Sequence, residues 1–139
     1  LDYGALTAGA RSGFFIMKTT PYIGVVGGLA FEVNGGTAYT NAAAVVLNTW
    51  TTIAVVCTTT NTTGAKFYKD GILQASSAAS KLFSTTTTAA GIGMSPTESA
   101  MYFSGAIDYL MIYFGVLTEE KIMEIHRNPF GTPDNPRLI

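Results

Sequence analysis

The sequence has few charged residues. Lys and Arg number 8 and Asp and Glu number 9, which is 12% of 139 residues and leaves a formal net charge of −1. A typical soluble domain has about 25% charged residues. Nucleic acids and anionic membranes are bound through clusters of Lys and Arg, so the charge balance supports neither as a partner. Disorder requires high charge and low hydrophobicity, whereas hydrophobic residues make up 47% here, so we expect most of the chain to fold.

Cysteine and long apolar runs are also scarce. Cys57 is the single cysteine, which excludes an internal disulfide and a cysteine-based zinc site. Because Cys57 lies inside an apolar run, we interpret it as a buried, unreactive thiol. Residues 107–114 are mostly apolar but much shorter than the ~18 residues needed to span a bilayer. The chain starts at Leu1 without a signal peptide, so we expect a processed or excised part of a longer protein.

The residues that are abundant favour β-strands. Thr, Val, Ile and aromatic residues dominate, and Gly, Asn and Asp separate them at short intervals. A helical spacing occurs only near the C-terminus. The expected strands are residues 13–18, 22–26, 29–33, 37–45, 50–58, 65–69, 72–75, 89–94 and 102–114.

Two of these strands carry the clearest signals. Residues 50–58 are apolar on both faces, which predicts a strand near the middle of a sheet with Trp50 packed in the core. Asp70 and Gly71 separate the two strands that follow. Asp-Gly tolerates the positive φ angles of a type I′ turn, so a hairpin is expected there.

A short helix is predicted after residue 117. Ile122 and Ile125 recur at helical spacing and would pack on the sheets. Thr118 is the expected N-cap, and the acidic residues 119 and 120 fall in the first turn, where the helix dipole favours negative charge. His126 falls in the last turn, where positive charge is favoured. This gives the only histidine a structural explanation.

The order of these pieces resembles the concanavalin A-like, laminin-G-type jelly-roll domains. The resemblance rests on the segments WTTIAVV, KFYKDGILQ, GIGM and FSGAIDYLMIYFGVLTEEKIMEIHRNPF. The matching residues are Trp50, Tyr68, Asp70, Gly71, Gly105, Ile107, Asp108, Leu117 and Thr118. The resemblance implies an all-β fold, namely an antiparallel β-sandwich with one short C-terminal helix over residues 1–130. An extended Pro-containing tail at 131–139 would follow it. Family members usually have further N-terminal strands, which indicates a truncated chain or a sandwich completed by a neighbour.

The acidic residues do not form a catalytic pattern. Glycoside hydrolases of the wider superfamily need two carboxylates across a cleft, as in the strand pattern E-x-D-x-x-E. Here the glutamates at 119, 120 and 124 lie on the predicted helix, and Asp108 is alone on its strand. An enzyme is therefore not expected, and no catalytic residue is assigned.

Metal binding has equally little support. Calcium is bound by six to eight oxygens, usually several of them from carboxylates. Asp70 is more simply a turn residue, and Asp108 is more simply a buried or half-buried acceptor near Gly105. The sequence holds no cluster of acidic loop residues, so no metal or other cofactor is assigned, and calcium stays an unsupported alternative.

Sugar binding would require exposed aromatic residues beside Asn, Asp or Gln. Tyr22, Tyr39 and Asn41 are the candidate ligand-binding residues, and Tyr68 with Gln74 is another such pair. The competing interpretation is that these tyrosines are half-buried strand residues.

The ending HRNPF is similar to that of such domains in phage virion proteins. Together with the low charge, this leads us to expect a non-catalytic structural or adhesion module of a virion or other surface assembly, extracellular or in the virion. Its partners would be neighbouring subunits and surface glycans. The alternative is a carbohydrate-binding module of an extracellular enzyme or adhesin.

Overall fold

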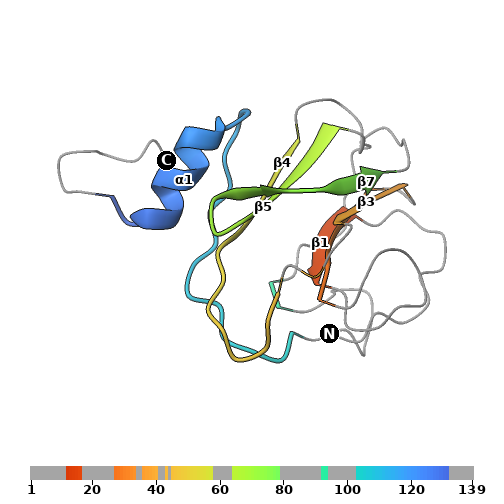
Figure 1. Ribbon diagram of the computed structural model, residues 1–139, viewed down its shortest axis with the longest axis horizontal. Helices are drawn as coiled ribbons and strands as arrows, with labels where there is room; N and C mark the ends of the chain where they lie inside the picture. Colours follow the sequence, from red (N-terminus) through yellow and green to blue (C-terminus); the bar gives the residue numbers. More distant parts are fainter. Residues whose placement is uncertain are drawn as a thin grey trace.

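The described part of the chain forms two antiparallel sheets and one helix. The structure is a computed structural model that describes residues 12–16, 27–33, 36–40, 43, 45–57, 64–78, 92–93 and 103–131. One sheet has the order β1-β2-β3-β7 and the other the order β4-β5-β6 (Figure 1). The elements are β1 Ser12–Ile16, β2 Leu29–Val33, β3 Gly36–Thr40, β4 Ile53–Cys57, β5 Ala65–Lys69, β6 Ile72–Gln74, β7 Ser76–Ala78 and α1 Glu119–Arg127. The expected all-β sandwich with one short helix is confirmed.

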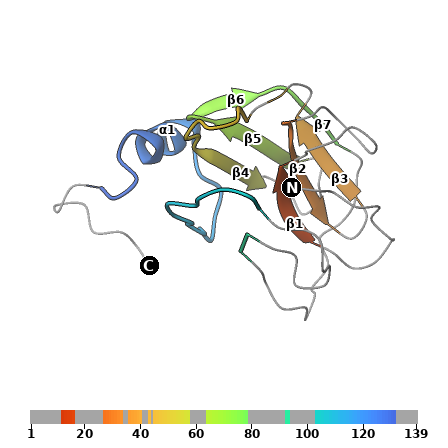
Figure 2. The same ribbon diagram turned by 90° about the horizontal axis from the view of Figure 1, so that it is seen from below.

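The β4-β5-β6 sheet lies between the other sheet and α1 (Figures 1 and 2). The core between the two sheets contains Leu29, Ala38, Ala65 and Phe67, and Leu29 and Phe67 are completely buried. Thr40 is also buried here, and its Oγ1 accepts a hydrogen bond from the backbone N–H of Leu29 at 3.0 Å. This bond satisfies two polar groups that would otherwise be costly to bury.

A second core lies between the β4-β5-β6 sheet and α1. It consists of Val56, Tyr68 and Ile122, with Ala54 and Leu117 packed against it. Ile122 is thus buried on the sheet, as its helical spacing predicted.

Strand β4 is apolar on both faces because each face has its own core. Ile53, Val55 and Cys57 pack against the inter-sheet cluster, whereas Ala54 and Val56 pack towards α1. The predicted alternation is confirmed, but the expected position in the middle of a sheet is not found among the described strands. Among the described strands, β5 is the central one and β4 pairs with β5 alone. The second face of β4 is apolar because α1 packs against it. From the sequence, this face had been explained by a position in the middle of the sheet.

The hairpin between β5 and β6 forms as expected. Asp70 and Gly71 have φ angles of +51° and +80°, and Lys69 pairs with Ile72 across the turn. Both central residues of a type I′ turn require positive φ, which Asp and Gly tolerate better than other residues. After this hairpin the chain crosses between the sheets at Ala75, since β6 pairs in one sheet and β7 in the other.

The strands expected at 29–33 and 65–69 are observed with the same bounds, as β2 and β5. Several other expected strands differ from the observed ones. The strand expected at 37–45 ends at Thr40, and the strand expected at 13–18 is β1, Ser12–Ile16. Ile92 and Gly93 form a bend instead of part of a strand. The expected strand at 22–26 and the tail from residue 132 lie outside the described residues.

The largest difference concerns the predicted strand at 102–114. Residues 103–114 form no strand, and Asp108 is exposed instead of buried or half-buried. Strand propensity is expressed only when a neighbouring strand accepts and donates the backbone hydrogen bonds, so a favourable composition alone does not form a strand. Within the residues that the structure describes, no helix has the length and apolar character needed to cross a membrane.

Candidate functional site

Trp50 lies on an exposed loop that precedes β4. The sequence predicted that this residue packs in the core, but 71% of its surface is exposed, and Leu47 in the same loop is 88% exposed. The prediction is wrong because β4 begins at Ile53, so the alternation of the strand does not extend back to Trp50. We call residues 45–50 the Trp50 loop.

The Trp50 loop is held at both ends. At its start, the N–H of Val45 donates a hydrogen bond to the carbonyl oxygen of Gly27 at 2.9 Å. At its tip the chain turns at Asn48, which has a φ of +58°. Asn adopts this left-handed conformation more readily than most residues, so the turn is locally encoded.

Thr52 fixes the other end of the loop through a set of contacts that we call the Thr52 hub. Its N–H donates to Oδ1 of Asp70 at 2.9 Å, and its carbonyl accepts from the N–H of Asp70 at 2.8 Å. Its Oγ1 lies 3.0 Å from Nδ1 of His126 and 3.4 Å from the hydroxyl of Tyr109. Tyr109 in turn packs edge-to-face on Phe130, with ring centroids 5.6 Å apart. The hub therefore joins β4, the β5-β6 turn, residues 103–113 and α1.

In the Thr52 hub, the hydroxyl of Thr52 lies beside the imidazole of His126, as a nucleophile lies beside its general base in an active site. Nucleophilic catalysis requires a third group that orients the base and stabilises its charged form. Among the described residues, Asp70 is the one carboxylate with a hydrogen bond in the hub, and it binds the backbone amide of Thr52 instead of the His126 imidazole. The geometry fits a structural role that anchors the Trp50 loop. Sequence reasoning missed the hub because His126 and Thr52 are 74 positions apart, and no local pattern links them.

Of the three residues predicted to bind a sugar, Tyr39 lies within the described part of the chain, and the site stays a prediction. Tyr39 is half-buried on β3, where it pairs with Ala30 and Ser77, and Tyr22 and Asn41 lie outside the described residues. The alternative pair of Tyr68 and Gln74 is wrong, because only 2% of Tyr68 is exposed.

The buried tyrosine has a specific environment. The hydroxyl of Tyr68 donates to Oε1 of Glu119 at 3.4 Å. Burial raises the pKa of Tyr68 above its ordinary value, and the negative charge and hydrogen bond of Glu119 raise it further. This tyrosine therefore connects β5 to the start of α1 instead of contacting a ligand.

The other reactive groups have structural environments too. Cys57 is half-buried, and burial raises the pKa of its thiol, which disfavours the nucleophilic thiolate. The carboxyl of Glu120 is exposed at the first turn of α1. Its own backbone N–H and the side chain of Thr118 lower its pKa. Among the described residues, no three His, Cys, Asp or Glu side chains are grouped so that they could hold a metal ion.

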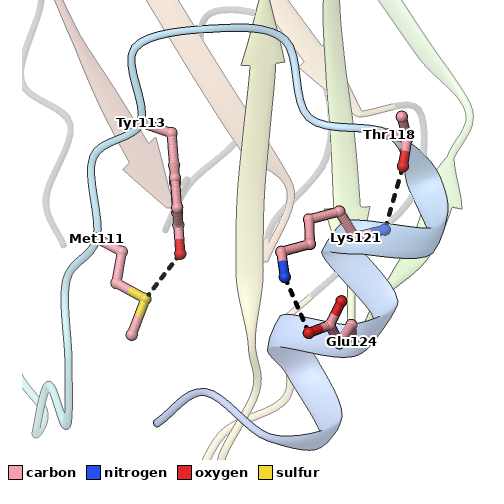
Figure 3. Close-up of polar contacts among 5 residues, drawn as sticks. All are labelled: Met111, Tyr113, Thr118, Lys121 and Glu124. Carbon is pink, nitrogen blue, oxygen red and sulfur yellow. Dashed lines mark hydrogen bonds and ion pairs between the residues drawn. The ribbon is translucent and has the colours of Figure 1, made fainter. Parts of the chain in front are cut away.

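The contacts of α1 confirm its predicted ends. Thr118 accepts a hydrogen bond from the N–H of Lys121 at 3.3 Å, and Lys121 forms an ion pair with Glu124 at 2.8 Å (Figure 3). His126 lies in the last turn, as expected. Such exposed pairs contribute well under 1 kcal/mol each, whereas an N-cap contributes about 1 kcal/mol.

These features describe a two-sheet antiparallel sandwich with a covering helix and an exposed aromatic loop. A sequence profile of the concanavalin A-like lectin/glucanases superfamily, in its laminin G form, matches residues 5–123. The chain therefore belongs to this superfamily.

One solved structure resembles the chain in fold. It contains residues 221–444 of an S-layer domain-containing protein from Clostridium thermocellum ATCC 27405. The TM-score is 0.49 and the sequence identity 15%, over 91% of this chain and 67% of that chain. A search of curated proteins found no match.

Proposed function

We propose that the chain is a non-catalytic structural or adhesion module. It would serve in a virion, as a phage capsid-decoration or tail protein, or in another surface assembly, where it contacts neighbouring subunits and surface glycans. The proposed location is accordingly extracellular or in the virion. The main support for this proposal is that Trp50 and Leu47 are exposed on a loop that is anchored at both ends.

An anchored, exposed Trp is suited to recognition. Trp is enriched among the residues that dominate binding energy at protein interfaces, because it brings a large apolar surface with few rotatable bonds. The loop is held by the Val45–Gly27 bond and the Thr52 hub, so little conformational freedom remains to be lost on binding. The chain has no charged residue between Glu32 and Lys66, so the partner surface would be neutral.

The absence of enzymatic activity is part of the proposal. The sequence lacks the alternating carboxylates of the related glucanases. In the described structure the glutamates of α1 lie on the helix that covers the outer face of the β4-β5-β6 sheet, and Asp108 is exposed. The proposal needs no cofactor and no calcium.

The proposal is tested by binding to the assembly that contains the chain. A tagged chain is incubated with purified particles or surface preparations and the bound fraction is measured by sedimentation. Trp50→Ala should lower binding at least tenfold, since truncation of a central interface Trp typically costs more than about 2 kcal/mol. The matched control is Ile72→Ala on β6, where the apolar side chain is 62% exposed, and this variant should bind as the unmodified chain does. Equal binding by both variants would contradict the proposal.

A second candidate function is a carbohydrate-binding module of an extracellular enzyme or adhesin. Asn48 lies two residues from Trp50, and both are exposed. An aromatic platform beside an amide is a combination that can stack on a sugar ring and hydrogen-bond its hydroxyl groups.

A glycan array tests the second candidate. The carbohydrate-binding module predicts binding to one glycan class that is lost in both Trp50→Ala and Asn48→Ala, with the fold intact by circular dichroism. Binding to no glycan, with or without calcium, would exclude it and leave the protein-contacting role. Turnover assays on β-glucans and galactans should give no product. Measurable hydrolysis would refute the non-catalytic part of the proposal.

A further inference from the structure

The β4-β5-β6 sheet has one strand fewer than the sheet it faces. The two sheets meet at Ala75, where β6 leads into β7, and β5 lies against β3. The strands therefore face one another as β6 with β7, β5 with β3 and β4 with β2, and Leu29 of β2 shares a core with Ile53 and Val55 of β4. Among the described strands, β1 faces no strand of the other sheet, and the place opposite β1 lies beside β4.

The edge of β4 beside this place has backbone groups that point out of the sheet. The N–H of Asp70 donates to the carbonyl oxygen of Thr52, so the antiparallel ladder directs the backbone groups of the even-numbered residues of β4 to β5. The backbone N–H and C=O groups of Ile53, Val55 and Cys57 therefore point away from β5. In the described part of the chain, no strand pairs with this edge.

Residues 109–114, which we call the strap, run from the start of β4 towards its end. At the start of the strap, the hydroxyl of Tyr109 lies 3.4 Å from Oγ1 of Thr52, the residue directly before β4. After the strap, the chain leads to Glu119, whose Oε1 lies 4.0 Å from Nζ of Lys66, a residue of β5 that pairs near the end of β4. The strap is therefore held near both ends of β4, and its direction is parallel to that of β4.

The side chains of the strap alternate in step with those of β4. Tyr109 contacts Thr52, whose Oγ1 also contacts His126 of α1, so Tyr109 is on the helix side of the sheet. The hydroxyl of Tyr113 contacts Sδ of Met111 at 3.2 Å (Figure 3). Side chains two positions apart share a side in extended backbone, which places Met111 and Tyr113 on the helix side as well. The alternate residues of the strap are then on the side of the other sheet.

These alternate residues are apolar. They are Leu110, Ile112 and Phe114, and all three are exposed. The residues of β4 on the same side pack in the core between the two sheets. A strand face of this composition is normally covered by a second layer, and β1 provides that layer in the place beside β4. Asp108 directly precedes the strap, so its charge would stay at the rim of the sandwich.

We propose that the strap closes onto the free edge of β4 as a fourth, parallel strand. The outward N–H and C=O groups of β4 then pair with the backbone of the strap, and Leu110 and Ile112 enter the core opposite β1. Parallel strands need a long connection, which the 51 residues from 58 to 108 provide. The described structure is the open form, and the closed form is a sandwich of two four-stranded sheets. This inference concerns the sandwich itself and does not rest on the proposed function.

Amide hydrogen exchange of the full chain, followed residue by residue by NMR, tests the closure. The amides of Ile53 and Val55 should exchange about tenfold or more slowly than in Ile112→Lys, which places a charge on the side of the strap that enters the core. Tyr113→Lys places the same charge on the helix side of the strap. This matched control should keep the slow exchange. Because Ile112 and Tyr113 are exposed in the open form, both variants should fold.

The single cysteine provides a second test. In the parallel register that places Tyr109 beside Thr52, Phe114 is opposite Cys57 and on the same side of the sheet. Paired strands bring opposite Cα atoms to about 5 Å, which is within the range of a disulfide. Phe114→Cys should therefore form an intramolecular disulfide with Cys57 on mild oxidation with diamide, detected by mass spectrometry of the unreduced monomer. In Tyr113→Cys the new thiol points to the helix side, so this control should stay reduced.

The proposal requires both results. It is overturned if the amides of Ile53 and Val55 exchange as fast in the unmodified chain as in Ile112→Lys. It is also overturned if their slow exchange persists in Ile112→Lys, because another segment would then pair with β4. Failure of Phe114→Cys to cross-link, or equal cross-linking of Tyr113→Cys, overturns it as well. None of these outcomes changes the dependence of surface binding on Trp50, so the proposed function stands or fails separately.

Discussion

Gly71 lies directly beneath Met123 of α1. A Cβ atom on Gly71 would be 2.8 Å from Sδ of Met123, closer than real Cβ contacts occur. The turn that joins β5 to β6 is thus also the surface on which the helix rests. Gly71 meets two requirements at once, since its φ of +80° favours glycine and the helix leaves no space for a side chain.

We expect Gly71→Ala to lower the free energy of unfolding by about 1–3 kcal/mol, from left-handed strain plus overpacking against Met123. Denaturant unfolding measures the loss. In the background of Met123→Ala, the same substitution should cost less, because the contact with sulfur is gone. Equal costs in both backgrounds would mean that the helix does not rest on the turn.

Thr118→Ala should destabilise the protein by about 1 kcal/mol, because the N–H of Lys121 loses its acceptor at the start of α1. Thr118→Ser should retain most of the stability. Thr49→Ala, in the exposed Trp50 loop, serves as the control and should change the unfolding free energy by less than about 0.5 kcal/mol. A loss at Thr49 equal to that at Thr118 would argue against the capping role.

The raised pKa of Tyr68 predicts a dependence of stability on alkaline pH. The unfolded tyrosine ionises near pH 10, whereas burial and Glu119 keep the folded one neutral. The unfolded state then binds fewer protons, so the stability that Tyr68 contributes is complete below pH ~10 and is lost as pH rises through the folded pKa.

The measurement compares unfolding free energies of the unmodified chain and of Tyr68→Phe at several pH values. The difference should be constant below pH ~9 and should shift in favour of the variant above pH ~10. A difference that is independent of pH would show that Tyr68 titrates normally in the folded state.

The local features of this fold were predictable from its sequence. The hairpin follows from Asp70 and Gly71, whose conformational preferences are intrinsic, and the helix ends follow from Thr118 and the charges of its first and last turns. The alternation of β4 was also predictable, because the period of two is a property of the strand itself.

The features that sequence reasoning missed depend on contacts between distant positions. The position of Trp50 depends on where pairing with β5 begins, and that pairing starts at Ile53. Residues 103–114 have the composition of a strand, but a strand also needs a partner, which composition does not reveal. The Thr52 hub joins His126 to a residue 74 positions away. The exposed Trp50 loop was therefore missed, because the apolar residues that follow Trp50 favoured core packing.

Trp50 is the single tryptophan of the chain, so its fluorescence reports whether it forms the proposed recognition surface. In the free chain, Trp50 should emit as a water-exposed indole and be readily quenched by acrylamide. On addition of the native assembly or its surface glycans, the emission should shift to shorter wavelength and quenching should fall. Blue-shifted, protected emission in the free chain, or emission that no assembly component or glycan changes, would show that Trp50 is not part of a recognition surface.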